Sequence, residues 1–319
     1  MQVGIIGAGA IGGWIAARLA HGGHDVRILA RAETGKALRA DGLALIQDGE
    51  RMVVHPRICT DAQEVGLCDL VIVGVKSFAL ESVAPSIAAM MKPETLVVPM
   101  LNGVPWWFMG RDVSLRSVDP HGILQKFLPY EQIVACVVHA AAARTSPAEI
   151  TLFRGDRLIM GEPGGGAGTR VSALVDQFRA AGLPAEQSHD VRADIWFKLW
   201  GNMTINPISA LTLATADRIL DDPLVLGLIA AVMEEAREIG RRIGCPIEQS
   251  TVERNAVTRK LGAFRTSMLQ DVDASRPIEL DALLAAPREI AAMVGVATPS
   301  LDILFGLTRL MGVSRGIYG

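Results

Sequence analysis

Cysteine is scarce in this sequence, and the patterns that would give it a structural role are missing. The four cysteines, Cys59, Cys68, Cys136 and Cys245, are scattered along 319 residues, with no C-x-x-C pair and no histidine at metal-ligand spacing. This excludes a disulfide framework and gives no basis for a metal site. Packed, reduced thiols are typical of cytoplasmic proteins, so we expect a cytoplasmic location and no metal ion.

Charge blocks and long hydrophobic runs are missing too. The formal net charge is −3 and no run of Lys or Arg forms a basic patch, which argues against nucleic acid as a partner. Apolar stretches are interrupted well short of the ~20 residues that cross a membrane, as Lys92 and Glu94 interrupt residues 87–107. The first residues carry no basic leader, so neither a signal peptide nor a membrane anchor is expected.

Apolar residues, by contrast, are plentiful. They make up 50% of the sequence, enough for a sizeable interior, and a chain of this length favours two domains. Patterns of short buried strands recur up to about residue 189, after which only helical periods are found. We therefore predict an α/β fold, with a Rossmann-type dinucleotide-binding domain over residues 1–189 and an all-α substrate and catalytic domain over residues 190–319.

A glycine-rich turn follows the first predicted strand, Gln2–Ile6, and precedes an amphipathic helical pattern. The turn consists of Gly7, Ala8, Gly9, Ala10, Ile11 and Gly12. In a G-x-G-x-x-G motif the first glycine permits a tight turn, the second lets a pyrophosphate approach the backbone, and the third lets helix and strand pack closely. Its context predicts a dinucleotide site; a structural turn without a nucleotide is the alternative.

The end of the second predicted strand, Asp25–Leu29, indicates which dinucleotide is used. NAD sites place a carboxylate about 20 residues after the glycines, whereas an Arg accommodates the 2′-phosphate of NADP. Arg31 follows this strand, with no acid before Glu33, so NADP is predicted, with Arg31 on its phosphate. Lys76, after a strand at 70–73, is a candidate for the adenosine end of the cofactor. The alternative for both cations is an ordinary solvated surface position.

Asn102 follows a strand predicted at 95–100, where its amide would lie beside a nicotinamide ring; an ordinary Asn-Gly turn is the alternative. Aromatic residues are only 5% of the sequence, yet Trp106, Trp107 and Phe108 are adjacent in the following loop. They fit a lid over a pocket, an anchor at an interface, or core packing of the loop.

Residues 196–207 present one ammonium and two amides at helical spacing. Lys198, Asn202 and Asn206 recur every fourth residue, and since four residues of α-helix advance about 400°, they share one face. The residues between them are largely apolar, so this row either satisfies internal groups or faces a cleft. We predict that the helix lines an interdomain cleft and ends near Asn206, since Pro207 disfavours helical angles in the residue before it. A lysine that extends to solvent is the alternative for Lys198.

The remaining elements are predicted from periodicity. A hairpin is expected from 43–46 and 52–55, strands at 133–138 and 157–160, and helices at 171–180, 224–243, 252–261, 278–294 and 300–311. The apolar faces of the later helices fit a subunit interface as well as a domain core, so a homodimer stays an open alternative.

The motifs resemble, in order and along nearly the whole chain, those of the ketopantoate reductases (2-dehydropantoate 2-reductases). The matching features are the glycine turn, Val75-Lys76, Asn102-Gly103, the Lys-Asn-Asn-Pro row of 198–207, and Ser267-Met268-Leu269-Gln270-Asp271 followed by Pro277-Ile278-Glu279. The last two features are the specific ones, because the glycine turn fits many dehydrogenases.

The resemblance implies reduction of ketopantoate to (R)-pantoate with NADPH, a step of pantothenate biosynthesis. It places the general acid on Lys198, the substrate-side carboxylate on Glu279, and substrate contacts on Asn102, Asn202, Asn206 and Ser267. The chemistry is consistent, because hydride delivery to a ketone develops negative charge that an ammonium can stabilise and then protonate. Glu279 would accept from a substrate hydroxyl or hold the lysine.

The loop after Gly103 departs from the family pattern, because it is long and carries Trp106 and Trp107. The 2-keto acid that fits therefore stays open. A D-2-hydroxyacid dehydrogenase acting on a bulkier acid is one alternative, and an NADP-sensing binding protein without turnover is another.

Overall fold

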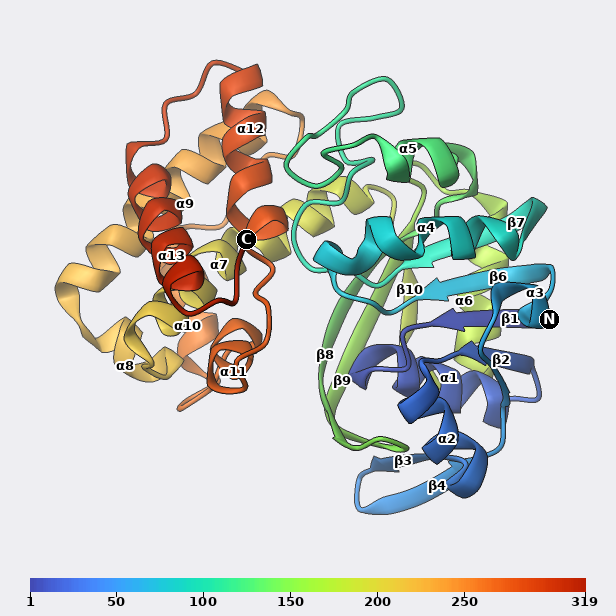
Figure 1. Ribbon diagram of the computed structural model, residues 1–319. Coiled ribbons are helices and arrows are strands. Elements are labelled where there is room, and N and C mark those ends of the chain that lie inside the picture. Colours follow the sequence, from blue (N-terminus) through green and yellow to red (C-terminus); the bar gives the residue numbers. More distant parts are fainter. The chain divides into compact units, whose positions relative to one another are not determined.

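The computed structural model describes residues 1–319, which form two compact units (Figure 1). Unit 1 contains Met1–Leu101, Trp106–Ser114 and His121–Val191, and unit 2 contains Asn102–Pro105, Leu115–Pro120 and Arg192–Gly319. All strands lie in unit 1 and the chain after residue 191 is helical, so the predicted α/β fold with an all-α carboxyl-terminal part is confirmed. None of the helices combines the length and hydropathy that a lipid bilayer requires.

The first sheet of unit 1 is parallel, with strand order β5-β2-β1-β6-β7. Its strands are β1 (Gln2–Ile6), β2 (Asp25–Leu29), β5 (Arg57–Cys59), β6 (Cys68–Val73) and β7 (Met91–Pro99). The intervening helices are α1 (Ala10–His21), α2 (Ala32–Asp41), α3 (Ala62–Val65) and α4 (Leu80–Ala89), with a 3₁₀ turn η1 (Ser77–Ala79). Because β1 lies between β2 and β6, the topological switch point, where such sheets bind ligands, is at the carboxyl end of β1.

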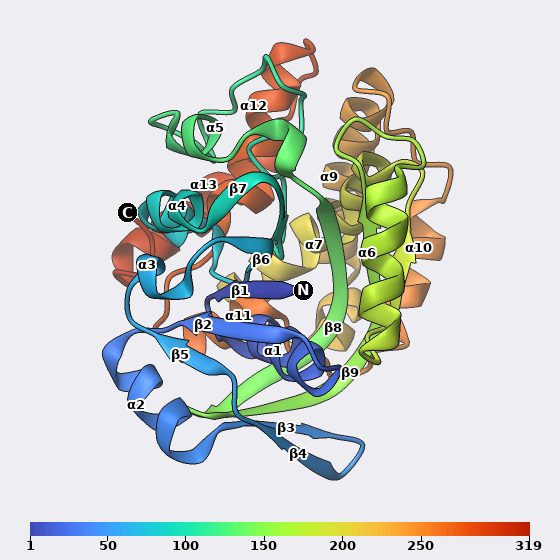
Figure 2. The ribbon, with the colours of Figure 1, turned by 90° about the vertical axis from the view of Figure 1, so that its right-hand side faces the viewer.

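The second sheet has the order β10-β9-β3-β4, with β8 also paired to β9 (Figure 2). Its strands are β3 (Leu43–Gln47), β4 (Glu50–Val54), β8 (Ala135–Ser146), β9 (Glu149–Gly161) and β10 (Ala185–Gln187). The predicted hairpin is present, turning through Asp48 and Gly49 at φ 53° and 81°, the left-handed angles of a type I′ turn. The strand predicted at 133–138 begins two residues before β8 and covers only its first four residues, and the strand predicted at 157–160 lies within the longer β9. Three short helices, α5 (Ile123–Phe127), η2 (Tyr130–Gln132) and α6 (Thr169–Ala180, predicted at 171–180), complete unit 1.

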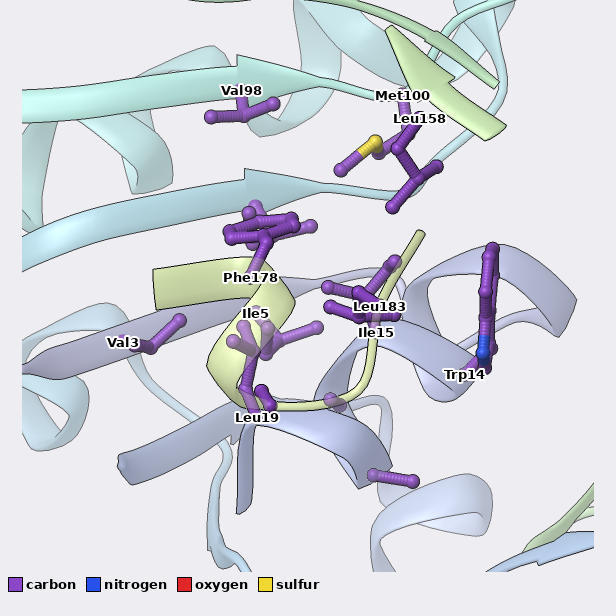
Figure 3. Close-up of a cluster of buried hydrophobic side chains, with 14 of the residues drawn as sticks. Val3, Ile5, Trp14, Ile15, Leu19, Val98, Met100, Leu158, Phe178 and Leu183 are labelled. Carbon is purple, nitrogen blue, oxygen red and sulfur yellow. The ribbon is translucent and has the colours of Figure 1, made fainter. Parts of the chain in front are cut away.

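Helix α1 is buried because it packs against strands of both sheets. Its side chains Trp14, Ile15 and Leu19 are at most 1% exposed and belong to one core with Val3 and Ile5 of β1 (Figure 3). Removing a large side chain from such a core costs about 2–5 kcal/mol. The helix that follows the glycine turn is thereby held firmly at its amino terminus.

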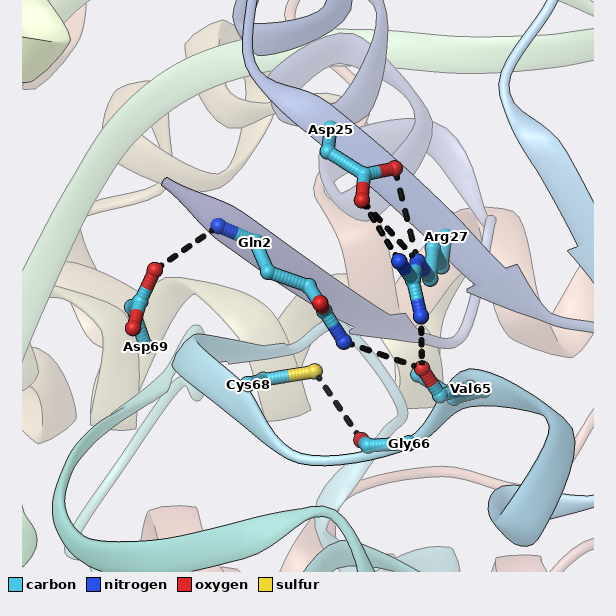
Figure 4. Close-up of polar contacts among 7 residues, drawn as sticks. All are labelled: Gln2, Asp25, Arg27, Val65, Gly66, Cys68 and Asp69. Carbon is cyan, nitrogen blue, oxygen red and sulfur yellow. Dashed lines mark hydrogen bonds and ion pairs between the residues drawn. The ribbon is translucent and has the colours of Figure 1, made fainter.

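Side chains tie together the opposite, amino-terminal edge of the parallel sheet (Figure 4). The backbone N–H of Gln2 donates to Asp69 Oδ2 at 2.8 Å, and its side-chain amide donates to the Val65 carbonyl at 3.1 Å. Arg27 Nη1 donates to the same carbonyl at 2.7 Å while Nη2 pairs with Asp25 at 2.7 Å. These contacts support the sheet at the end away from the switch point.

The main body of unit 2 is a set of helices. They are α7 (Val191–Thr212), α8 (Ala216–Asp221), α9 (Pro223–Arg242), α10 (Thr251–Arg259), α11 (Ser267–Asp273), a π-helical turn η3 (Asp281–Ala285), α12 (Ala286–Met293) and α13 (Pro299–Ser314). Trp196 and Trp200 of α7 are fully buried, and their indole N–H groups donate to the Ala236 and Met233 carbonyls of α9 at 3.1 and 2.7 Å. Helix α7 is therefore the central element of this unit.

The prediction that the α7 helix ends near Asn206 is wrong, because it continues through Pro207 to Thr212. The preference of pre-proline residues for extended angles is a tendency that packing can override. Ile208, Ser209 and Ala210 beyond the proline are all buried, and burial of this last turn favours the continued helix.

Candidate active site

The glycine turn has the geometry of a dinucleotide cradle. Gly7 adopts φ +87°, and a Cβ there would lie 2.7 Å from the backbone of Gly74 and Val75. A Cβ on Gly12 would lie 2.1 Å from the Gly7 carbonyl oxygen, so α1 and β1 approach as closely as the motif requires. A Cβ on Gly9 would meet nothing nearer than 4.0 Å, which leaves open space at the residue whose backbone a pyrophosphate approaches.

The two predicted cofactor cations follow the strands on either side of β1. Arg31 is exposed and occupies the N-cap position of α2, just after β2. Lys76 is partly buried and occupies the N-cap position of η1, just after β6. Neighbouring parallel strands end at one edge of the sheet, so both cations and the glycine turn belong to the carboxyl edge at the switch point.

Lys198 and Asn102 are brought into direct contact within unit 2. The Lys198 Nζ donates to Asn102 Oδ1 at 2.8 Å, although the two residues are 96 positions apart. Lys198 lies in the second turn of α7 and is partly buried. The bond uses one of the three donors of the ammonium and holds it in place, while the amide N–H₂ of Asn102 still has donors to offer.

The backbone after Asn102 is held by the π-helical turn η3. Gly103 has φ +80°, and a Cβ there would lie 2.4 Å from the Ala282 carbonyl oxygen. The N–H of Val104 donates to that oxygen at 2.8 Å. Ala282 O is available because the Ala286 N–H bonds Asp281 O in the π register, and residue 287, which would come next, is a proline without an N–H. The predicted helix at 278–294 is therefore wrong at its start, which is an irregular segment followed by this π turn.

Asn202 and Asn206 lie on α7 one and two turns after Lys198. Asn206 is 7% exposed, and its side-chain amide makes no hydrogen bond within the chain. Asn202 is partly buried, and its amide likewise has no partner. Buried polar groups in native proteins are usually hydrogen-bonded, so two unpaired amides in line with Lys198 are suited to receive a ligand.

Ser267 is the exposed first residue of α11. The residue before it, Thr266, is 1% exposed, caps the helix by accepting from the Leu269 N–H, and forms a 2.5 Å hydroxyl–hydroxyl bond with Ser209 of α7. This buried bond joins the start of α11 to the last turn of α7. Thr266 and Ser209 are supporting residues that the sequence did not indicate, since hydroxyl pairs 57 positions apart have no local pattern.

Glu279 lies between two anchored residues. Ile278 N–H donates to the Ile317 carbonyl at 3.1 Å, and Tyr318 Oη donates to Asp281 Oδ1 at 2.6 Å. Burial raises the pKa of the Asp281 carboxyl, and the Tyr318 bond opposes that rise. Burial, and then the bond to Asp281, raise the pKa of Tyr318 above its usual range. The carboxyl-terminal residues therefore hold the segment that carries Glu279.

The aromatic residues of the long loop are part of a core. Trp106 and Trp107 are 4% exposed and Phe108 is 0% exposed. Three interpretations of this loop were open: a lid, an interface anchor and core packing. The burial of these side chains supports core packing. All four cysteines are also buried and none forms a disulfide, and no group of three or more His, Cys, Asp or Glu side chains is arranged to hold a metal ion.

Comparisons with known proteins agree along the whole chain. The family model described as ketopantoate reductase PanE/ApbA matches residues 3–165, and the model of its C-terminal part matches residues 190–312. The chain is 38% identical to a 2-dehydropantoate 2-reductase of Mesorhizobium japonicum over 325 aligned positions that cover 100% of both proteins. The crystal structure of a candidate ketopantoate reductase from Ralstonia solanacearum MolK2 is 51% identical, with a TM-score of 0.96 and 99% of each chain covered.

A more distant likeness concerns the fold alone. A structure of D-mandelate dehydrogenase with NADH and anilino(oxo)acetate is 22% identical, with a TM-score of 0.85 and coverage of 99% of this chain and 100% of that one.

Proposed function

The chain belongs to the ketopantoate reductase family, and from that premise we propose that it reduces 2-dehydropantoate to (R)-pantoate with NADPH, in pantothenate biosynthesis. The observation that carries the proposal is the Lys198–Asn102 bond at 2.8 Å, in line with the unpaired amides of Asn202 and Asn206. An ammonium held by an amide, with further amides beside it, suits a small acid that carries a ketone, a carboxylate and a hydroxyl.

The cofactor fits the glycine turn of unit 1. Bound NADPH would supply the hydride, and the space at Gly9 together with the α1 amino terminus would hold its pyrophosphate. Arg31 would pair with the 2′-phosphate, because it occupies the start of α2 where an NAD enzyme carries an acid. Lys76 would contact the adenosine end, and the amide of Asn102 would lie at the nicotinamide end.

Lys198 is proposed as the general acid. Its ammonium donates to Asn102 and, in the complex, would also donate to the substrate oxygen. Negative charge that develops on this oxygen is stabilised by the ammonium, which then transfers a proton to the alkoxide. Asn102 holds the ammonium in position before the reaction, so little reorganisation is needed when the charge develops.

The other polar groups are proposed to orient the acid. Asn202, Asn206 and Ser267 would donate to substrate oxygens, and Glu279 would accept from the substrate hydroxyl. Glu279 is suited to this role because a carboxylate is an acceptor only and would repel the substrate's own carboxylate.

A D-2-hydroxyacid dehydrogenase acting on a bulkier 2-keto acid is the second candidate. The fold likeness to D-mandelate dehydrogenase favours it, because the structure of that protein contains anilino(oxo)acetate, an aromatic oxoacetate. The sequence argument for a bulkier substrate was that Trp106 and Trp107 reshape the acyl pocket; their burial supports core packing of the loop instead. Cytoplasmic location and a homodimer stay predictions from the sequence.

The test is NADPH oxidation at 340 nm by the purified protein with ketopantoate, beside a panel of branched and aromatic 2-keto acids and with NADH in parallel. We expect the highest kcat/KM for ketopantoate with NADPH. A faster panel member would transfer the assignment to the second candidate. Tight NADPH binding without oxidation by any acid would support the binding protein without turnover instead.

A further inference from the structure

Two arginines stack on aromatic side chains of α7, and only one of them is neutralised. The Arg237 guanidinium of α9 lies 5.3 Å from the ring centroid of Trp200 and pairs with Glu234 at 2.7 Å. It also donates to the Gln249 carbonyl at 2.6 Å. This is the usual condition of a guanidinium in a packed environment, where a carboxylate and a carbonyl compensate its desolvation.

Arg254 of α10 is the exception. Its guanidinium lies 5.4 Å from the ring centroid of Phe197, and its buried Nε has no hydrogen-bond partner, which is also true of Arg237 Nε. The difference between the two arginines is the carboxylate. No carboxylate pairs with it. The adjacent Glu253 is committed to the capping box of α10, where it accepts from the N–H and hydroxyl of Ser250 at 2.8 and 2.6 Å. Burial lowers the pKa of Arg254, and no neighbouring charge offsets this effect.

The backbone of α7 makes room for this guanidinium. A Cβ on Gly201 would lie 2.5 Å from Arg254 Nη2 and 2.9 Å from Nε, so any larger residue would displace the arginine. Glycine inside a helix costs roughly 0.5–1 kcal/mol relative to alanine. Gly201 lies between Lys198 and Asn202 in sequence, and the helical angle places it about 60° from Lys198 around the axis. Arg254 therefore lies on the Lys198 side of the polar row, whereas Asn202 and Asn206 are about 100° and 140° from Gly201 around the axis.

We propose that Arg254 is an anion-binding residue that takes the carboxylate group of the 2-keto acid. The proposal rests on the proposed function, because that function supplies a ligand with a carboxylate next to its ketone. A partly buried guanidinium without a carboxylate partner is satisfied when a ligand carboxylate accepts from its N–H groups, and guanidinium matches the planar geometry of carboxylate. Lys198 and Arg254 then bind different groups of the substrate, the ammonium at the ketone oxygen and the guanidinium at the carboxylate.

The first experiment compares an acid with its uncharged ester. KM and kcat are measured for ketopantoate and its methyl ester with wild type, Arg254→Gln and Arg254→Lys. The control is Arg241→Gln, which removes the same charge from an exposed ion pair on α9. We expect Arg254→Gln to raise KM for the acid about 10- to 100-fold, the size of a charge-assisted hydrogen bond. KM for the ester should stay unchanged, Arg254→Lys should recover part of the loss, and the control should match wild type.

Gly201→Ala provides a second variant that should fold well. Alanine favours the helix while its Cβ pushes the guanidinium away, so we expect an undiminished Tm together with a raised KM for the acid. If Arg254 serves only to pack α10 on α7, Arg254→Gln will lower Tm and raise KM for acid and ester alike. That outcome, or an unchanged KM for the acid in Gly201→Ala, overturns the proposal.

A binding measurement separates this proposal from the proposed function. Oxamate, a carboxylate analogue of 2-keto acids that is not reduced, is titrated calorimetrically into the NADPH-loaded wild type and Arg254→Gln. Loss of oxamate binding in the variant supports the anion site even if the wild type reduces no 2-keto acid. Equal oxamate binding by both proteins refutes the site, and it leaves the reductase assignment intact if the wild type turns over ketopantoate.

Discussion

Replacing Gly103 by alanine tests whether the backbone after Asn102 positions the proposed catalytic pair, Lys198 and Asn102. Two effects act at this position. The φ of +80° is a left-handed angle, which costs an L-residue roughly 1–2 kcal/mol. The added Cβ would also lie 2.4 Å from the Ala282 carbonyl oxygen, about 1 Å inside ordinary van der Waals contact at 3.4 Å. Because this neighbour is backbone in a packed π turn, the segment with Asn102 must shift by about that distance.

A shift of this size is large on the scale of catalysis. The Lys198–Asn102 bond at 2.8 Å would lengthen beyond hydrogen-bond range, and a misplacement of about 1 Å can lower a rate about 100-fold. We therefore expect Gly103→Ala to lower kcat for ketopantoate about 100-fold, with NADPH affinity nearly unchanged. The left-handed strain should lower Tm by roughly 2–8 °C, from the scaling of about 2–4 °C per kcal/mol for domains of 150–250 residues.

Gly110→Ala is the matched control. Gly110 also has a positive φ, +102°, but a Cβ there would meet nothing within 4 Å. Its Tm should fall from the left-handed strain alone, and so by no more than that of Gly103→Ala, and its kcat should stay unchanged. The assays are NADPH oxidation under saturating substrate, NADPH titration by fluorescence, and thermal unfolding. Equal kcat for the two variants would refute the reasoning, because the rate would then follow backbone strain in general rather than the position of Asn102.

Three further results are expected. Lys198→Ala should lower kcat by about 10²- to 10⁴-fold, the range of general acid catalysis, and leave the Kd for NADPH unchanged; an unaltered kcat would remove the lysine from its role. Arg31→Ala should weaken NADPH roughly 10- to 100-fold more than NADH, because only NADPH loses a charged contact, and equal losses by titration would contradict the cofactor assignment. Asp69 has a pKa held below its usual range by Lys92 and then by the Gln2 N–H, so it stabilises the fold above the unfolded pKa of 3.8 and this stabilisation is lost as pH falls through the lower folded value. Tm of Asp69→Asn should therefore decline less than that of wild type between pH 4 and 2, and parallel declines would refute this linkage.

The features that were predicted well have local causes. The strand Gln2–Ile6 and the hairpin at Asp48-Gly49 are present because a short apolar run, or a pair of residues that accept left-handed angles, decides the local backbone. The row of Lys198, Asn202 and Asn206 likewise follows from helical spacing alone. Such signals lie within a few residues of sequence, which is why they could be interpreted without a structure.

The features that were missed depend on distant partners. Residues 140–143 are alanines, which have low strand propensity, yet they belong to β8 because they pair with β9. The contact between Lys198 and Asn102 joins residues 96 positions apart, and no local sequence pattern predicts it. Arg254 was overlooked for the same reason, since its missing partner is visible only once the packing of α10 on α7 is known.

The irregular segment before α12 helps to fix the backbone of the proposed site, because the helical hydrogen-bond pattern is interrupted there. Pro287 lacks an N–H, so one carbonyl of the preceding turn must lose its helical donor. In the π register that carbonyl is Ala282 O, and it accepts from Val104, the second residue after Asn102. An unsatisfied buried carbonyl costs about 1–3 kcal/mol. The Val104 N–H removes this cost by donating to Ala282 O, and the segment after Asn102 is thereby held in place. The requirement of the helix for a donor and the requirement of Lys198 for a fixed acceptor are met by one short segment, which is why Gly103, a residue without functional groups, is expected to control the rate.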